Sequence, residues 1–351
     1  MKPPVPIRSA VAKMRPYKPP LEGRFGKIRL DFNENTLGCS PAVRRALRRL
    51  SSAALSMYPE QETTRRKLAR FFGVDAADLL LTNGTDEALN LVVNTFVDPG
   101  SRVLIVEPTF AMYRFYSELA GARVKALRYD SLMHFPMEQV LAALRAASRV
   151  LFLANPNSPT GGLLSLGDLK KILNAARRTM VVVDEAYFEF SGVTMLPEIR
   201  RFRNLIVTRT FSKAAGIAGL RLGCVFAHRE IASHLRKAQS PYPVNVAALA
   251  SAEAAIRDRA FITRTVREVS QGKRELERGL RALEIEQFPS AANFILVNFG
   301  SQAKEIVSRL ARKGILVRDR SSDFAGEGYV RITIGTRREI RLLLRELRAI
   351  L

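Results

Sequence analysis

Short apolar strands alternate with helices between residues 79 and 207, and this alternation limits the possible folds more than any other feature of the sequence. Runs rich in Val, Ile and Leu predict strands at 79–82, 102–106, 123–127, 149–153, 180–183 and 204–207. Strands separated by helices of this length form a mostly parallel sheet with helices on both faces. Burial on both faces also explains why these strands contain few polar residues. We therefore predict an α/β fold.

The rest of the chain predicts two further parts. A helical region at 229–283, broken by prolines at 241–243, precedes strand candidates at 294–297, 314–317 and 329–334. This change of rhythm predicts a large domain at 40–250 and a smaller C-terminal α/β domain at 251–351. Residues 1–39 show little periodicity apart from a strand candidate at 28–32. We expect them to form an arm whose strand joins the sheet of the small domain.

Composition argues against several classes of protein. The chain of 351 residues has a net charge of +23, but its basic residues are interleaved with apolar ones in helical segments such as 43–50 and 337–351. That pattern is typical of solvated helix faces, so nucleic-acid binding is a minor hypothesis. Cys39 and Cys224 are too few for a disulfide framework or a thiolate metal site, and we expect no metal. Without a signal peptide or the ~20 apolar residues of a membrane helix, a soluble, cytoplasmic protein is expected.

Polar segments follow four of the predicted strands, at 83–87, 107–110, 155–162 and 184–187. Ligands of open α/β sheets bind beyond the carboxyl ends of the strands. Gly84 allows close approach of an anion at a helix start, although Thr85 or Asp86 could simply cap that helix. Phe110 can cover a flat ring, although such a residue more often belongs to the core. Asp184 follows four apolar residues and needs a partner, either a protonated pyridine nitrogen or an arginine.

The stretch 205–223 places a lysine and an arginine after the last predicted strand. Lys213 is a nucleophile toward carbonyl compounds once it is desolvated. The Arg221 guanidinium, with the hydroxyls of Thr210 and Ser212 nearby in sequence, suits a phosphate. An aldehyde that carries a phosphate would satisfy both groups. The alternative is a solvated lysine and an ion-paired arginine, and these residues alone do not decide between the two.

Three motifs occur in a fixed order: NPNSPTG at 155–161, VVVDEAY at 181–187 and TFSKAAGIAGLRLG at 210–223. In this combination the chain resembles the fold-type-I pyridoxal-phosphate (PLP) aminotransferases, and within them the histidinol-phosphate aminotransferases. The resemblance extends to DFNENTLG at 31–38, NGTDEAL at 83–89, EPTFAMY at 107–113 and YVRITIGT at 329–336. It implies a large domain with a mostly parallel seven-stranded sheet in α/β/α layers and a smaller C-terminal domain.

The resemblance also implies roles for individual residues. Lys213 would bind the cofactor aldehyde and move the substrate proton, and Asp184 would keep the pyridine nitrogen protonated. Tyr187 would bind the ring hydroxyl, and Phe110 would stack on the ring. The cofactor phosphate would be held by a further group of residues, with Tyr58 contributed by a second subunit of a homodimer that the N-terminal arm also reaches. This group comprises Gly84, Thr85, Thr210, Ser212, Arg221 and Tyr58, and Asp86 is a further expected cofactor-binding residue.

Substrate contacts follow from the same resemblance. Arg331 occupies the position that binds a carboxylate, Arg318 and Tyr17 match residues that engage a substrate phosphate, and Asn33 lies near the substrate end. One departure concerns Ser158, where the family usually has Asn before Pro-Thr-Gly. Either Ser158 reaches the ring hydroxyl through a water, or Asn157 takes over this role.

The implied reaction is a ping-pong exchange of an amino group between L-histidinol phosphate and 2-oxoglutarate in histidine biosynthesis. Two PLP-dependent alternatives remain open: an aromatic amino-acid aminotransferase, and a decarboxylase that acts on threonine phosphate. A third alternative, a nucleic-acid-binding regulator on a degenerate aminotransferase scaffold, is suggested by the net charge of +23. The presence of Asp184, Lys213 and Arg221 argues against it.

Overall fold

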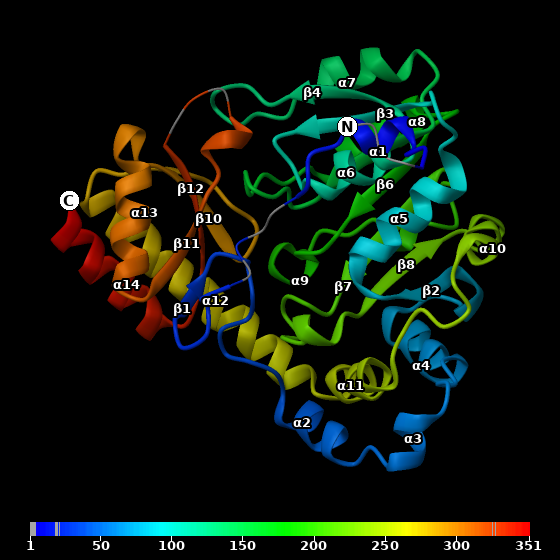
Figure 1. The fold of residues 1–351 in the computed structure, drawn as a ribbon, viewed down its shortest axis with the longest axis horizontal. Coiled ribbons are helices and arrows are strands. Elements are labelled where there is room, and N and C mark those ends of the chain that lie inside the picture. The colour runs from blue at the N-terminus through cyan, green and yellow to red at the C-terminus, as the bar shows by residue number, and fades with distance from the viewer. Residues whose placement is uncertain (1–4, 18–19, 21, 325, 327) are drawn as a thin grey trace.

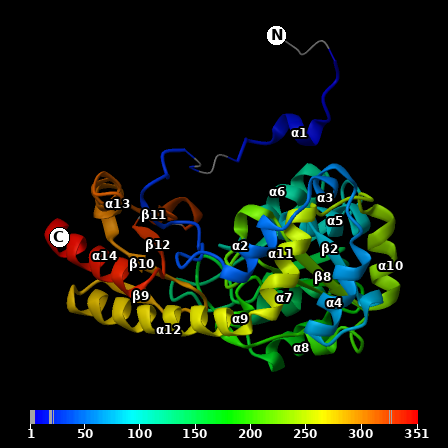
Figure 2. The same ribbon diagram turned by 90° about the horizontal axis from the view of Figure 1, so that it is seen from below.

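The computed structural model describes residues 5–17, 20, 22–324, 326 and 328–351, and it contains two β-sheets with separate helical coverings (Figure 1). The expected arm at 1–39 lies only partly within this range, because residues 1–4, 18–19 and 21 are outside it. One long helix, α12 (Arg259–Ala282), extends from below the larger body to the smaller one (Figure 2). Across the described residues, no helix is both long and apolar enough to cross a membrane.

The larger sheet has seven strands in the order β2-β8-β7-β6-β5-β3-β4. These are β2 (Leu79–Thr82), β3 (Arg102–Glu107), β4 (Arg123–Arg128), β5 (Val150–Ala154), β6 (Met180–Asp184), β7 (Leu205–Thr210) and β8 (Gly223–Ala227). Only β8 runs antiparallel to its neighbours, β2 and β7. The prediction of a mostly parallel, seven-stranded sheet is confirmed. β8 itself was not predicted, because only a three-residue 3₁₀ turn at Ala218–Leu220 separates it from β7 and the strand–helix alternation does not reveal it.

Helices cover both faces of this sheet. Successive residues of a strand point to opposite faces, and in the central strands the residues on both faces are buried. Val181 and Val183 pack on one side with α2 (Pro41–Arg48), α4 (Glu62–Phe72), α7 (Met137–Leu144), α8 (Leu166–Ala175) and α11 (Val246–Arg257). Val182 and Ile206 pack on the other side with α5 (Gly84–Phe96), α6 (Met112–Leu119) and α10 (Arg229–Ala238). The strand ends between these two layers are where the polar segments of the sequence lie.

The smaller sheet has five strands in the order β1-β11-β12-β10-β9. They are β1 (Ile28–Leu30), β9 (Glu286–Phe288), β10 (Phe294–Asn298), β11 (Ile315–Asp319) and β12 (Tyr329–Thr333), and they pack on α12, α13 (Ala303–Arg312) and α14 (Arg337–Ile350). β1 pairs in parallel with β11, so the N-terminal segment completes a sheet built by the C-terminal third of the chain. The short strand β9 was not predicted.

The predicted helical region at 229–283 contains the three helices α10, α11 and α12. α11 crosses the expected domain boundary at 250 and packs on α2 and α4 of the large body. The helical conformation is interrupted at Asp258, between α11 and α12. The Asp258 carboxylate accepts hydrogen bonds from the backbone N–H of Phe261 and from the hydroxyl of Ser40. We therefore propose that the domains meet at Asp258. The remaining short helices are α1 (Ser9–Lys13), α3 (Ser52–Ser56) and α9 (Phe188–Ser191).

Candidate active site

A cavity of about 370 Å³ opens at the carboxyl ends of β5, β6 and β7, beside the segment that leaves β1. Ten of the residues singled out in the sequence line it: Thr85, Asp86, Phe110, Ser158, Asp184, Tyr187, Thr210, Ser212, Lys213 and Arg221. They come together because parallel strands end at the same edge of a sheet. The other predicted residues lie behind the cavity wall or at a distance from it.

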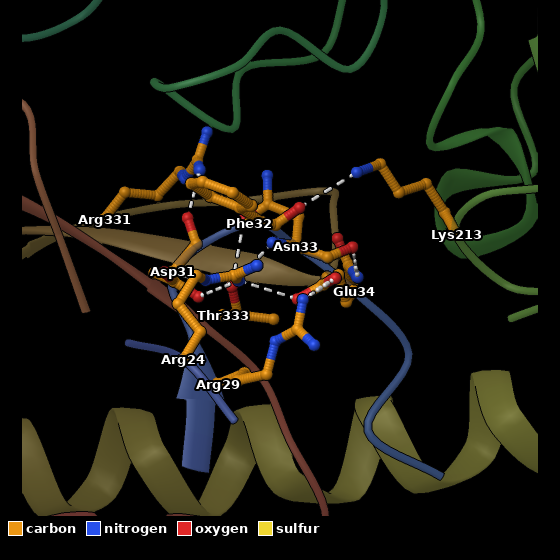
Figure 3. Close-up of polar contacts among 10 residues, drawn as sticks. Arg24, Arg29, Asp31, Phe32, Asn33, Glu34, Lys213, Arg331 and Thr333 are labelled. Atoms are coloured by element: carbon orange, nitrogen blue, oxygen red, sulfur yellow. Dashed lines mark hydrogen bonds and ion pairs between the residues drawn. The ribbon is translucent and has the colours of Figure 1, made fainter. Parts of the chain in front are cut away.

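Lys213 lies in the turn after β7 and points into the cavity. The turn is fixed by hydrogen bonds from the Phe211 N–H to the Leu222 carbonyl (3.1 Å) and from the Ile217 N–H to the Phe211 carbonyl (3.2 Å). The half-buried Lys213 donates from Nζ to the Phe32 carbonyl at 3.1 Å (Figure 3). Its Nζ also lies 5.7 Å from the centre of the Tyr187 ring. An amine in this position faces any carbonyl compound that enters the cavity.

Asp184 ends β6 and is only 4% exposed. Its two oxygens accept hydrogen bonds from the hydroxyls of Tyr113 and Thr208, each at 2.9 Å. Burial raises the pKa of Asp184 above its ordinary value, against the opposing effect of these donors. Within the described part of the chain, no lysine or arginine forms an ion pair with it. A cationic N–H inside the cavity would supply the missing charge, so the carboxylate fits a protonated pyridine nitrogen.

Arg221 lines the cavity at the start of α5, with Gly84 directly against its guanidinium. Both have left-handed backbone conformations, with φ of 55° for Arg221 and 74° for Gly84. A Cβ at position 84 would lie 2.5 Å from Nη2 of Arg221, so only glycine allows the guanidinium to rest against the helix start. Arg221 donates to Asp86 at 2.9 Å. Free N–H groups of α5, this guanidinium and the hydroxyls of Thr85 and Ser212 make a cradle that fits a phosphate.

Tyr187 and Asn33 form one hydrogen-bonded unit. The Tyr187 hydroxyl accepts from Asn33 Nδ2 at 2.8 Å. Asn33 is 1% exposed, and its backbone N–H donates to the Thr333 hydroxyl at 3.0 Å. Asn33, which the resemblance places near the substrate end, therefore lies behind Tyr187 and connects β1, β12 and the large domain.

The loop after β5 separates its two candidate side chains. Asn157 donates to the Pro108 carbonyl and the Thr160 hydroxyl, both at 2.9 Å, and accepts from the Thr109 hydroxyl at 2.7 Å. Its amide thus joins this loop to the segment after β3, and Asn157 does not line the cavity. Ser158 does line it. The geometry favours Ser158 over Asn157 as the group that faces a bound ring.

Arginines of the small domain form the far end of the site. Arg331 on β12 is 8% exposed and donates to the Ser158 hydroxyl at 2.9 Å and to the Asp31 carbonyl at 2.6 Å. Burial, together with the neighbouring charges of Arg320 and Arg318, lowers its pKa to about 10. Its Nε is buried and has no hydrogen-bond partner in the described part of the chain. A donor of this kind suits an anionic substrate group.

Three predicted residues lie away from the cavity wall. Arg318 sits opposite Arg331 on the paired strand β11, with its guanidinium carbon 5.8 Å from the centre of the Phe32 ring. Tyr17 is 47% exposed and close enough to raise the pKa of Arg331. Tyr58 is 75% exposed and stacks on Tyr242 with ring centres 4.2 Å apart, so it does not reach the cavity of its own chain.

Sequence reasoning missed several groups that contact the predicted residues. Thr208 could have been found, because it is a hydroxyl within an apolar strand and pairs in register with Asp184. Tyr113 ends the motif EPTFAMY without an expected role, whereas its hydroxyl donates a hydrogen bond to Asp184. Phe32 acts through its backbone carbonyl, which no sequence motif can indicate.

A second cavity, of about 520 Å³, lies on the other side of β7 and shares Thr210 with the first. Aromatic residues line much of it, including Phe72 and Phe188, together with the carboxyl group of Glu189. Burial raises the pKa of Glu189 to about 7 from its ordinary value of 4.5. The folded protein therefore keeps a proton that the unfolded chain loses as the pH rises.

Replacing Glu189 with glutamine is expected to flatten the dependence of stability on pH between about 4.5 and 7. The wild-type free energy of unfolding should fall across this window, because ionisation of Glu189 is penalised only in the folded state. At pH 7.5 the variant should melt roughly 2–6 °C above wild type, with no difference at pH 4.5. Thermal unfolding at several pH values measures this, with Glu138→Gln as the control because that side chain is 86% exposed. If wild type, Glu189→Gln and Glu138→Gln showed the same dependence of melting temperature on pH, the raised pKa of Glu189 would be contradicted.

Comparison with known proteins supports one family. The family model for aminotransferase class I and II matches residues 26–347. The histidinol-phosphate aminotransferase of Symbiobacterium thermophilum is 36% identical over 358 residues, which cover 98% of each chain. That of Caldanaerobacter subterraneus subsp. tengcongensis is 37% identical over 330 residues, 93% of each chain.

Solved structures give the same result. The histidinol-phosphate aminotransferase from Sinorhizobium meliloti in complex with pyridoxal-5'-phosphate is similar with a TM-score of 0.85 and 26% identity, covering 92% of each chain. L-threonine-O-3-phosphate decarboxylase from Porphyromonas gingivalis is similar with a TM-score of 0.82 and 26% identity, covering 92% of this chain and 99% of that one. Since the family model spans most of the chain, this protein belongs to the class I and II aminotransferases.

Proposed function

We propose that the protein is a histidinol-phosphate aminotransferase that uses PLP to exchange an amino group between L-histidinol phosphate and 2-oxoglutarate. One observation carries the proposal: a lysine, a buried carboxylate and a phosphate cradle surround one cavity, and the buried Arg331 lies behind its wall, bound to Ser158. The curated relatives of the same name, at about the same length, support the choice of reaction.

The residues present fit PLP at each of its polar ends. The cradle of Gly84, Thr85, Ser212 and Arg221, with Thr210, would hold the phosphate. Asp184 would hold the proton on the pyridine nitrogen, and the buried hydroxyl donors keep that carboxylate in place. When bound, PLP supplies an electron sink for the substrate α-carbon.

The chain's own side chains then perform the remaining tasks. Lys213 would bind the cofactor and move a proton at its Nζ atom, from a half-buried position in the cavity wall. Tyr187 and Ser158 would bind the ring hydroxyl, and Phe110 would stack on the ring. For the substrates, Arg331 binds the carboxylate of glutamate.

The substrate phosphate is assigned to Arg318 and Tyr17, the residues that extend the basic end of the site beyond Arg331. A homodimer is part of the proposal, because the exposed Tyr58 could then complete the cofactor phosphate site of a second copy, with the N-terminal arm beside it. Two free cysteines agree with a cytoplasmic location.

Replacing Arg318 with alanine tests the choice of substrate. The kcat/KM for histidinol phosphate is expected to fall about 10- to 100-fold, because a charge-assisted contact to the phosphate is lost. The half-reaction with glutamate, which has no phosphate, should stay within about threefold, since that difference is below 1 kcal/mol. Stopped-flow absorbance of the two half-reactions measures both. Arg312→Ala, at an exposed position on α13, is the matched control, and equal losses in both half-reactions would refute the assignment.

A decarboxylase acting on threonine phosphate is the second candidate, favoured by the similarity to the Porphyromonas gingivalis enzyme. The same guanidinium groups would hold its substrate. The products formed from glutamate and from threonine phosphate distinguish the two functions. Glutamate must convert the bound cofactor to its amine form in a transaminase, whereas threonine phosphate must release CO₂ in a decarboxylase.

A further inference from the structure

The segment Asp31 to Glu34, which follows β1, contacts three active-site groups through consecutive residues. Two of these groups, Lys213 and Arg331, are seen in Figure 3. The Asp31 carbonyl accepts from Arg331 at 2.6 Å, and the Phe32 carbonyl accepts from Lys213 at 3.1 Å. The Asn33 side chain donates to the Tyr187 hydroxyl at 2.8 Å. This site strap, residues 31–34, thus sets the relative positions of groups that come from both domains.

Arg24 holds the strap at both of its ends. Its guanidinium donates to the two carboxylate oxygens of Asp31 at 3.1 and 2.7 Å, and to Glu34 at 2.9 Å. The guanidinium carbon also lies 3.9 Å from the centre of the Phe32 ring. A planar guanidinium suits this arrangement, because it binds a carboxylate with two parallel bonds and covers an aromatic face simultaneously.

The strap needs such a clamp for two reasons. Asp31 is 3% exposed and Arg24 is 9% exposed, so each charge depends on the other for compensation in a site with little water. Asn33 has a φ of 55°, a conformation that persists only when neighbouring contacts enforce it. Arg24 also lines the cavity, so its loss would affect the cavity wall directly.

We propose that Arg24 is a positioning residue of the active site. It holds the site strap so that the Phe32 carbonyl keeps Lys213 aimed into the cavity and the Asp31 carbonyl keeps Arg331 against Ser158 at the cavity wall. The inference rests on the proposed function and adds a residue to it that lies outside the motifs of the family resemblance. Arg24 acts through the strap and is not assigned a step in the chemistry.

Arg24→Gln and Arg29→Gln form a matched pair for testing this. Arg29 binds the same Glu34 carboxylate from the outer side, with its side chain 40% exposed, but does not line the cavity. Hydrogen–deuterium exchange of the cofactor-free proteins, with peptides covering 31–34 and 213, measures the strap itself. Visible circular dichroism of the PLP-saturated proteins, kcat and KM measure the site.

For Arg24→Gln we expect faster exchange in both peptides, a weaker dichroic signal per bound cofactor and a fall in kcat of about 10-fold or more. Arg29→Gln should match wild type in all of these. Should Arg24→Gln fail to fold, Arg24→Lys replaces it, since lysine keeps the charge but cannot form the fork. Unchanged exchange, dichroism and kcat in the folded Arg24 variant would overturn the proposal. Failure of wild type to bind PLP would overturn the proposed function instead, while the exchange data still decide the role of Arg24.

Discussion

Replacing Lys213 with alanine is expected to reduce turnover by about 10⁴-fold or more, because the variant loses both the amine that binds the cofactor and the base that moves the substrate proton. Lys213 is the lysine that lines the cavity, and its Nζ lies against the Phe32 carbonyl. The variant should also lose the absorbance change that accompanies addition of PLP to the cofactor-free protein. Steady-state assays and absorbance titration measure the two effects.

The matched control for this experiment is Lys237→Ala, at an exposed position in the last turn of α10. It should behave as wild type in both measurements. Substantial turnover by Lys213→Ala would remove the central residue of the proposed mechanism. Methylamine added to the inactive variant offers a further check, since a free amine can partly replace a missing lysine as proton carrier.

Replacing Asp184 with asparagine is expected to lower kcat by about 10³-fold, with only a small change in protein structure. Asparagine preserves the shape of the side chain, and the hydroxyls of Tyr113 and Thr208 can still bind it. The amide cannot hold a proton on the pyridine nitrogen, so the cofactor becomes a weaker electron sink. The rate of the glutamate half-reaction measures the loss, with Asp98→Asn as the control because that side chain is 78% exposed.

The same substitution should stabilise the protein when no cofactor is bound. Burial raises the pKa of Asp184, so its ionised form is penalised in the folded state at pH values above the ordinary pKa of 3.8. The wild-type stability therefore decreases as the pH rises past that value, and asparagine removes this effect. A higher melting temperature at pH 7.5 together with lower activity separates a functional carboxylate from a purely structural one. Equal or lower stability of the variant would argue that Asp184 has a structural cation partner.

The site residues at the carboxyl ends of the strands in the larger sheet were predictable from the sequence, because strands and the polar segments after them are local features. Five of the six strands predicted between residues 79 and 207 are followed by a polar segment that was singled out in the sequence, and parallel pairing brings their carboxyl ends together. Asp184 and Lys213 could be placed beside each other on this basis alone. The family motifs indicated the roles of Asp184 and Lys213, and the parallel pairing of β6 and β7 explains why the two residues lie close together.

The remaining parts of the site depend on contacts that the sequence does not encode locally. No α-helix lies between β7 and β8, so the strand–helix alternation does not indicate β8. α11 continues past the expected domain boundary because its apolar face packs on α2 and α4. Asn157 and Ser158 are adjacent in sequence, yet only Ser158 faces the cavity. The cis peptide bonds at Asn155–Pro156 and Ser158–Pro159 belong to this loop, and its conformation cannot be read from the order of its residues.

The sequence by itself determined the fold class, the family and the residues at the strand ends, since hydrophobic periodicity and short motifs are properties of neighbouring residues. Only the tertiary structure decided how the two domains meet around the cavity. Arg331 reaches Asp31 across 300 residues, and Lys213 reaches Phe32 across 181. Two of these four groups are backbone carbonyls, which every residue possesses, so their function arises from position in space and leaves no mark in the residue type.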